Sequence, residues 1–118
     1  MKYMLLIYGE ENALSEAERQ QCYHESAQLA HELNAAGKFI ATSPLQLTAT
    51  ATSVRVREGS WYVTDGPFAE TREQLGGYFL IDANDLDEAV AIAARIPGAS
   101  RGTVEIRPLV ELTGLPGQ

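Results

Sequence analysis

Apolar and polar residues alternate along the chain in blocks that predict a mixed α/β fold. Apolar runs at 2–8 and 76–82 are bounded by glycine or acidic residues, which is typical of strands in the middle of a sheet. Shorter apolar stretches at 38–42 and 103–109 predict two further strands. The pattern therefore indicates one sheet of four strands.

Two segments with helical periodicity separate these strands. The first is expected over 15–36, because Ser15 followed by Glu18 forms a capping-box pattern and Gly37 is a typical helix stop. The second is expected to begin after Asp85 and to end before Pro97. The apolar stripe of this second helix is expected to comprise Leu86, Ala89, Val90 and Ala93, flanked by Ile92 and Ile96.

A hairpin is expected in the middle of the chain, after extended residues at 45–50. Residues 53–57 and 61–64 alternate in polarity on either side of a turn that contains Gly59. The resulting order is β-α-β, a hairpin, and β-α-β again. Without the hairpin, this is the split βαβ pattern of the ferredoxin-like α+β fold. We expect a single domain at 1–112 and a loose C-terminal tail at 113–118.

This topology predicts a homodimer, because both helices must lie on one face of a single antiparallel sheet. The other face keeps apolar side chains, expected to be Tyr3, Leu5, Ile7, Tyr78 and Leu80 or their alternating neighbours. Burial of apolar surface stabilises by roughly 25 cal/mol per Å². We therefore expect two sheets to pack face to face as a dimeric α+β barrel, with a pocket between them or under the hairpin region 50–74.

Composition restricts the partners of this chain. It has 118 residues and a formal charge of −7, from 16 acidic and 9 basic side chains. Such a surface disfavours nucleic acid and anionic membranes. The N-terminal apolar run is too short for a signal peptide or a membrane span. Cys22 is the only cysteine, which excludes an intrachain disulfide and indicates the reducing cytoplasm; we expect it buried or half-buried on a helix.

The segment at 65–73 is the main candidate for chemistry. Asp65 leaves a strand, Gly66 permits a positive φ, Pro67 stiffens the next bond, and Phe68 is expected to plug inward and anchor the loop. A carboxylate held in this way can act as a general acid or base if an apolar pocket raises its pKa. The alternative is an aspartate that caps its own turn through backbone N–H groups.

Other candidate site residues are spread over the chain. His24 has the side chain of a proton shuttle, although an exposed helix histidine is the simpler interpretation. Glu70 and Arg72 are candidates for binding a polar ligand or for a solvated loop with internal ion pairs. Tyr78 is a candidate ligand contact on a core strand.

Two arginines of the hairpin are candidates for binding an anionic ligand. The sequence contains no metal-binding or cofactor-binding motif. Arg55 and Arg57 share one face of their strand and could clamp a carboxylate, or simply face solvent. His24 and His31 are seven residues apart, about 10 Å along a straight helix, which is too far to share a metal ion. No Ser-His-Asp arrangement or glycine-rich phosphate loop is present, so no cofactor is expected.

The stretch DGPFAETREQLGGY at 65–78 resembles the signature of the YCII-related, or DGPF-domain, proteins. The first eight residues and the segment 104–108 resemble the ends of the same family. The resemblance implies a dimeric ferredoxin-like α+β barrel. It also implies a proposed His-Asp active site, relatives that include a dehydrochlorinase domain and muconolactone-isomerase-like folds, and, in some members, an association with extracytoplasmic-function sigma factors.

The resemblance also bears on the histidine of the implied pair. In the YCII branch, a histidine lies on the first helix, before the segment that matches 29–36. The register places Ser26 at that position in this chain, rather than His24 or His31. A shift of two residues would bring in His24, but on a helix it turns the side chain by about 200°.

Two functions follow from these observations. The first is a cofactor-free enzyme of the isomerase, lyase or dehydrohalogenase type, in which Asp65 transfers a proton and His24 or Tyr78 assists. The second is a non-catalytic dimer that binds a small organic ligand or acts in regulation, for example in sigma-factor-dependent transcription. The ligand contacts expected in either case are Gly66, Pro67, Phe68, Glu70, Arg72 and Tyr78.

Overall fold

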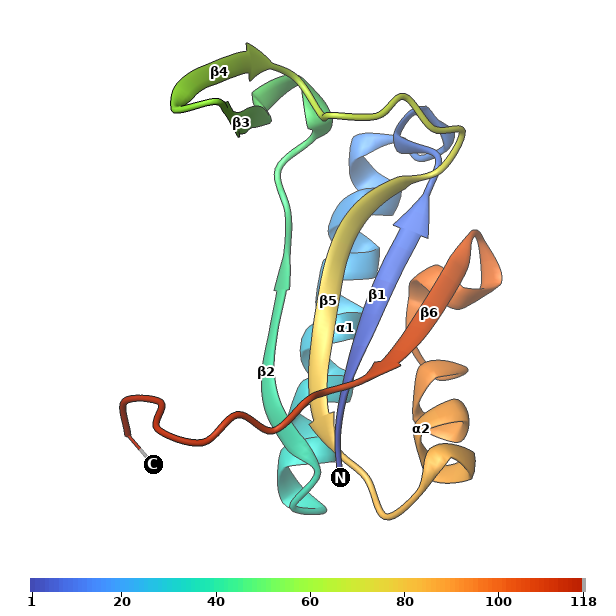
Figure 1. The fold of residues 1–118 in the computed structure, drawn as a ribbon. Helices are drawn as coiled ribbons and strands as arrows, with labels where there is room; N and C mark the ends of the chain where they lie inside the picture. The colour runs from blue at the N-terminus through green and yellow to red at the C-terminus, as the bar shows by residue number, and fades with distance from the viewer. Residues whose placement is uncertain (118) are drawn as a thin grey trace.

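The computed structural model, which describes residues 1–117, contains a four-stranded antiparallel sheet, two helices and a separate hairpin (Figure 1). The strands are β1 (Lys2–Gly9), β2 (Phe39–Pro44), β3 (Thr52–Arg57), β4 (Ser60–Asp65), β5 (Gln74–Asp82) and β6 (Thr103–Pro108), and the helices are α1 (Glu16–Ala35) and α2 (Leu86–Ala93). The strand order is β2-β5-β1-β6, with β3 and β4 paired on their own. This order and the antiparallel pairing confirm the predicted α+β fold and agree with a ferredoxin-like arrangement.

The core lies between the two helices and one face of the sheet. Leu5 and Phe79 are paired across β1 and β5 and are 0% and 1% exposed. They pack with Leu33 of α1 and Ile92 of α2 in one buried cluster. Both helices therefore cover the same face of the sheet, as Figure 1 shows.

The opposite face of the sheet, here called the open face, carries Met4, Leu6, Tyr78 and Leu80, all half-buried. On β5 the residues named first in the expectation face outward, and on β1 their alternating neighbours do, which was the second possibility. Tyr3 and Leu5 are buried under the helices and Ile7 packs against that core, so their alternating neighbours face outward. The reason is that Leu5 pairs with Phe79, and paired residues share a face.

The helix boundaries agree with the capping signals. The Ser15 hydroxyl accepts a hydrogen bond from the Glu18 N–H at 3.1 Å, and the Glu18 carboxylate accepts one from the Ser15 N–H at 3.0 Å. Gly37 follows α1 with φ of +74°. This geometry satisfies free N–H groups at the start of the helix and ends it at a residue that tolerates the left-handed region.

The stripe predicted for α2 is wrong by a rotation about the helix axis. Leu86 and Val90 are 53% and 50% exposed. The buried residues are Ala89, Ile92, Ala93 and Ile96. These positions follow the i, i+3, i+4, i+7 spacing of a helix face, and Ile96 lies just beyond α2, before a short 3-10 helix at Pro97–Ser100.

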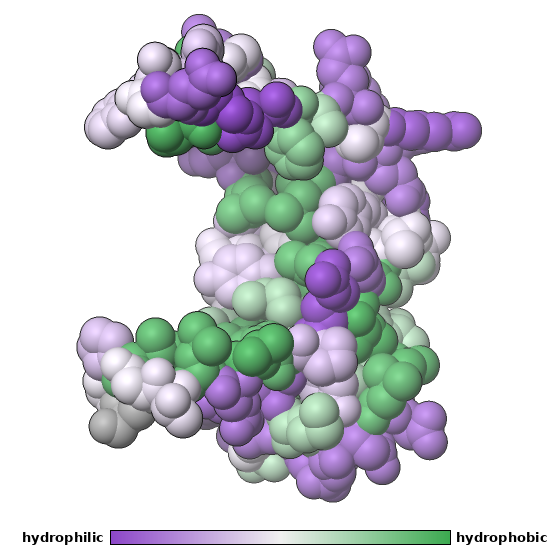
Figure 2. All heavy atoms as spheres, in the orientation of Figure 1, coloured by the Kyte–Doolittle hydropathy of each residue, from purple (hydrophilic) through white to green (hydrophobic). Residues whose placement is uncertain are grey.

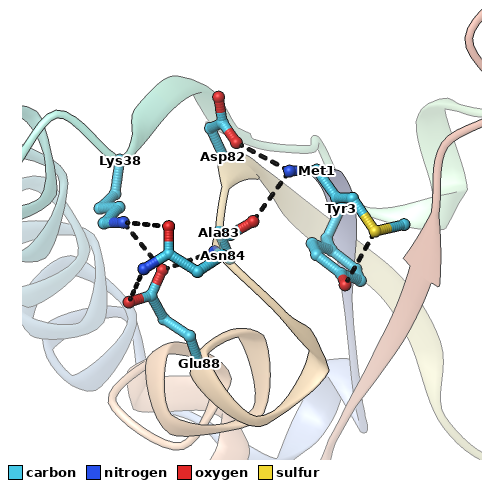
Figure 3. Close-up of polar contacts among 7 residues, drawn as sticks. All are labelled: Met1, Tyr3, Lys38, Asp82, Ala83, Asn84 and Glu88. Atoms are coloured by element: carbon cyan, nitrogen blue, oxygen red, sulfur yellow. Dashed lines mark hydrogen bonds and ion pairs between the residues drawn. The ribbon is translucent and has the colours of Figure 1, made fainter.

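A polar cluster ties the end of the sheet to α2 (Figure 3). The Lys38 ammonium lies 2.9 Å from the Glu88 carboxylate, which also accepts the Asn84 N–H at 2.9 Å. These contacts, with the Asn84 N–H the larger cause, lower the pKa of Glu88. The Met1 ammonium binds the Asp82 carboxylate at 3.2 Å. The cluster joins the start of β1, the end of β5 and the turn before β2.

The hairpin β3–β4, here called the arm (residues 52–65), projects away from the body of the molecule (Figure 1). Its base is closed by a 2.7 Å hydrogen bond from the Gly66 N–H to the Ala51 carbonyl. The radius of gyration is 16.1 Å, whereas a compact domain of this length is expected near ~13.5 Å. Trp61 is 78% exposed and Tyr62 is 55% exposed, so these aromatic residues do not belong to the core of the chain.

Two further segments complete the chain. The extended stretch expected at 45–50 is interrupted by a short 3-10 helix, Thr48–Thr50. The chain after β6 extends to the same side as the arm, and the two frame a recess in the space-filling view (Figure 2). The tail expected at 113–118 is exposed up to residue 117, and Gln118 lies outside the described residues. Neither α1 nor α2 has the length and apolarity that a membrane crossing requires within residues 1–117.

Candidate functional site

A pocket of about 270 Å³ lies between the first half of α1 and the sheet, and we call it the α1 pocket. Its apolar wall includes Ile7, Leu14, Leu45, Phe79 and Ile96. Gly76 and Gly77 of β5 also line it and present backbone without side chains. This location differs from the expected ones, between two subunits or under the hairpin, because α1 keeps small and polar residues where a core helix would carry leucine.

The helix side of the α1 pocket is polar. Arg19, Cys22, Tyr23 and Ser26 follow the i, i+3, i+4, i+7 spacing that places side chains on one helix face. The hydroxyls of Tyr23 and Ser26 and the thiol of Cys22 make no hydrogen bond within residues 1–117. Further along α1, Leu29 and Leu33 are buried in the core. The first half of α1 therefore lines the pocket, and its second half packs in the core.

The charged groups around the α1 pocket are compensated inside the chain. The Glu11 carboxylate accepts the Thr48 N–H at 2.7 Å and the Thr48 hydroxyl at 2.9 Å. Arg19 donates to the Glu11 carbonyl at 3.1 Å and lies 3.7 Å from the Glu16 carboxylate. At the rim, Arg101 lies 3.4 Å from Glu18.

The contacts at the rim change the pKa of Glu18. The pKa of Glu18 is lowered, chiefly by the Ser15 N–H, then by the Ser15 hydroxyl, and less by Arg101. The α1 pocket as a whole therefore offers an apolar body, a row of uncharged polar groups and no charge that lacks a partner.

Asp65, the main candidate from the sequence, lies at the end of the arm and is exposed. Its carboxylate makes no hydrogen bond within residues 1–117, so it does not cap its own turn, and it does not line the α1 pocket. Gly66 does use the positive φ expected of it, at +92°. The expectation that Phe68 plugs inward is wrong, since this side chain is 79% exposed.

The other predicted site residues lie apart from one another. Arg72 forms a 2.7 Å ion pair with Glu10, which raises the pKa of Arg72, while Glu70 is exposed. Tyr78 belongs to the open face, and His24 is exposed on α1. None of these four residues lines the α1 pocket.

The arm carries a shallow hollow of its own, lined by Arg55, Arg57, Tyr62, Pro67 and Phe68 together with Ser53 and Thr64. This hollow lies within the hairpin region where a pocket was expected. Arg55 and Arg57 form no ion pair within residues 1–117, whereas each of the other five arginines has an acidic partner. The two arginines therefore remain available to an anion or to an acidic surface.

Comparison with known proteins identifies the family of this chain. The sequence profile of the YCII-related domain matches residues 1–113. The chain belongs to the YCII-related domain family. It is also similar to an uncharacterized protein of Rhizobium meliloti (strain 1021), with 38% identity over 114 residues that cover 92% of each chain.

In this YCII-related protein, the helix position that the resemblance assigns to a histidine is relevant to the pocket. Ser26 lines the α1 pocket, whereas His24 and His31 are exposed and do not. Within residues 1–117, no group of three His, Cys, Asp or Glu side chains is arranged to hold a metal ion. The pocket-facing part of α1 therefore carries hydroxyl and thiol groups, and it carries no imidazole.

Sequence reasoning missed Tyr23 as a site residue, and it considered Ser26 only as the position that matches the family's helix histidine. A signal for them was present: the first half of the helix carries small and polar residues at the spacing where the second half carries Leu29 and Leu33. This signal is weak, because the same residues are compatible with a helix that faces solvent. Only the position of Leu45 and Leu47 across from the helix identifies the face as a pocket wall.

Proposed function

We propose that this YCII-related protein is a non-catalytic dimer that binds a small organic molecule in the α1 pocket. The observation that carries the proposal is the pocket itself, a cavity of about 270 Å³ inside one subunit with apolar walls and a few directed polar groups. Ligand sites in proteins commonly have this composition. The proposal requires no metal ion and no cofactor.

The enzyme hypothesis has weaker support from this geometry. A general base must come within hydrogen-bond reach of the proton it removes. Asp65 does not line the α1 pocket, and the carboxylate of Glu11, which does, is engaged by Thr48. Alternation along β4 places Asp65 on the same side of the arm as Trp61 and Val63. Proton transfer by Asp65 therefore needs this side of the arm to be covered by a second subunit.

The dimer is supported by two apolar surfaces that stay partly or largely exposed within residues 1–117. The open face carries Met4, Leu6, Tyr78 and Leu80. One side of the arm carries Val54, Val56, Trp61 and Val63, each more than half exposed. Isolated two-stranded hairpins are marginal in water, so the arm gains stability if its apolar side is covered. We infer that a second copy of the chain covers both surfaces.

Sedimentation velocity of the purified protein at micromolar concentration tests the dimer. Leu80→Lys places a charge on the open face and is expected to shift the protein to monomer. Val90→Lys is the matched control, because Val90 is half-exposed on α2, away from the open face, and should leave the dimer intact. A wild-type monomer would contradict the proposal.

Ligand binding is tested by backbone amide chemical-shift titration with 4-methylphenol and 1,4-dimethylbenzene as probes. At least one probe is expected to shift amides of α1 and β5 in the wild type. Ser26→Phe fills the pocket and is expected to abolish these shifts, whereas Gln28→Phe adds the same ring on the exposed side of α1 and should not. The proposed function fails if no probe binds, or if binding persists in Ser26→Phe.

A further inference from the structure

We infer that the ligand of the α1 pocket is a small, uncharged aromatic molecule with a hydroxyl group, held with that hydroxyl against Tyr23 and Ser26. This inference rests on the proposed binding function and adds the chemical class of the ligand. It is carried by three features of the pocket, namely its apolar walls, its row of free hydroxyls and its compensated charges.

The walls favour an apolar, planar body. Ile7, Leu45 and Phe79 line the pocket, and the Gly76–Gly77 backbone adds a flat surface. A Cβ at Gly76 would meet only the Ile7 carbonyl oxygen, at 3.8 Å, so packing inside the chain does not demand glycine there. An apolar cavity of about 150 Å³ is large enough for benzene. The α1 pocket therefore has room for a substituted ring.

The helix side favours a hydroxyl. Tyr23 is 36% exposed and Ser26 is half-buried, and neither hydroxyl has a partner within residues 1–117. Hydroxyl groups without a protein partner are expected to bind water in a pocket that holds no ligand. A ligand that displaces the water without replacing its hydrogen bonds loses affinity. Because a hydroxyl both donates and accepts, a ligand hydroxyl can bind a Tyr or Ser hydroxyl whichever way that group's proton points.

The charges favour a neutral ligand. Each ionised group that lines the pocket already has a partner: Glu10 pairs with Arg72, Arg19 with Glu16 and Arg101 with Glu18, and Glu11 accepts hydrogen bonds from Thr48. An anionic ligand would have to break one of these contacts to gain a counter-ion, and burial of an unpaired charge is costly. The nearest unpaired arginines, Arg55 and Arg57, belong to the arm and do not line this pocket.

The test compares three probes of similar shape by amide chemical-shift titration of the full-length protein: 4-methylphenol, 1,4-dimethylbenzene and 4-methylbenzoate. The variant Tyr23→Phe/Ser26→Ala removes both hydroxyls with little change in shape. We expect it to weaken 4-methylphenol binding about three- to tenfold, the range of about one lost hydrogen bond, and to change 1,4-dimethylbenzene binding less than about twofold. We expect 4-methylbenzoate to bind more weakly than 4-methylphenol.

The outcomes separate this inference from the function on which it rests. If no probe binds the wild type, the proposed function fails and the inference fails with it. If 4-methylphenol binds wild type and variant equally well, the hydroxyl assignment is overturned while the binding function stands. If 4-methylbenzoate is the tightest ligand, the assignment of a neutral ligand is overturned.

Discussion

Among the glycines within residues 1–117, Gly102 has the least room for a side chain, because the backbone of β1 lies directly beside it. A Cβ at this position would overlap the Tyr8 carbonyl oxygen and lie 3.0 Å from the Gly9 Cα, both of which belong to the backbone of β1. Backbone atoms cannot rotate away from a new methyl group as a flexible side chain can. The start of β6 is therefore held against the end of β1 by the absence of a side chain.

Gly102→Ala is expected to destabilise the protein by at least about 1–3 kcal/mol, as overpacking does elsewhere. The measurement is the free energy of unfolding in urea. Gly9→Ala is the control, because a Cβ at Gly9 meets nothing within 4 Å. Equal stability of the two variants would contradict the close approach of β1 and β6.

The exposed carboxylate of Glu18 makes the stability of the start of α1 depend on pH. Its pKa is lowered from 4.5 by Ser15 and Arg101 in the folded protein. The ionised form is thus favoured by folding, so its stabilising effect is fully present above pH 4.5 and is lost as the pH falls through the lower folded value.

Glu18→Gln is expected to lower the free energy of unfolding at pH 7 and to reduce its fall between about pH 5 and pH 3. Glu25→Gln, on the same helix but outside the capping box, should leave that dependence unchanged. Urea titrations at a series of pH values provide the measurement. An identical pH profile for Glu18→Gln and wild type would refute the role of the capping box.

At the scale of secondary structure, the arm is independent of the core. No residue of the arm belongs to the buried cluster, and its two ends are joined by the hydrogen bond between Gly66 and Ala51. The body therefore loses no core contact if the arm is removed, and a short turn is enough to connect the remaining chain.

Replacement of residues 52–65 by two glycines is expected to leave the helical circular dichroism unchanged and to shift the melting temperature of the monomer by less than about 4 °C. The same variant is expected to dimerise more weakly, because the apolar side of the arm is lost. The monomer reference is Leu80→Lys with and without the arm. Unfolding of the body on removal of the arm would show that the arm contributes to the fold of the subunit.

At the scale of the whole molecule, charge opposes association. Each copy carries a formal charge of −7, so two copies repel each other at low ionic strength. The ion pairs of Met1, Arg72 and Arg107 lie at the surface and contribute little to stability. The screening length falls from about 30 Å at 0.01 M salt to about 10 Å at 0.1 M.

The dimer is therefore expected to tighten as sodium chloride is raised from about 0.01 M to about 0.1 M, and sedimentation equilibrium measures the change. Arg55→Gln/Arg57→Gln is a useful comparison, since these unpaired arginines are available to acidic groups of a second copy. If salt weakens the wild-type dimer and this variant removes the effect, attraction through the arm outweighs the overall repulsion, contrary to the expectation.

Local chemistry accounts for the features that were predicted correctly. Ser15 with Glu18, Gly37 and Asp85 carry their helix-boundary signals within a few residues, and α1 and α2 begin where these signals place them. The apolar runs of β1 and β5 likewise predict correctly that these strands contribute buried residues to the core. The order of strands and helices, and with it the ferredoxin-like α+β fold, could therefore be read from the chain alone.

Features that depend on distant partners could not be obtained in this way. Which face of β1 is buried depends on the pairing of Leu5 with Phe79, and the exposure of Phe68 depends on which distant segments pack against it. The α1 pocket exists because Tyr23 and Ser26 face Leu45, from a different part of the chain. Periodicity along a sequence describes which residues share a face, whereas the identity of the surface opposite that face is set by contacts between distant segments, which only folding brings together.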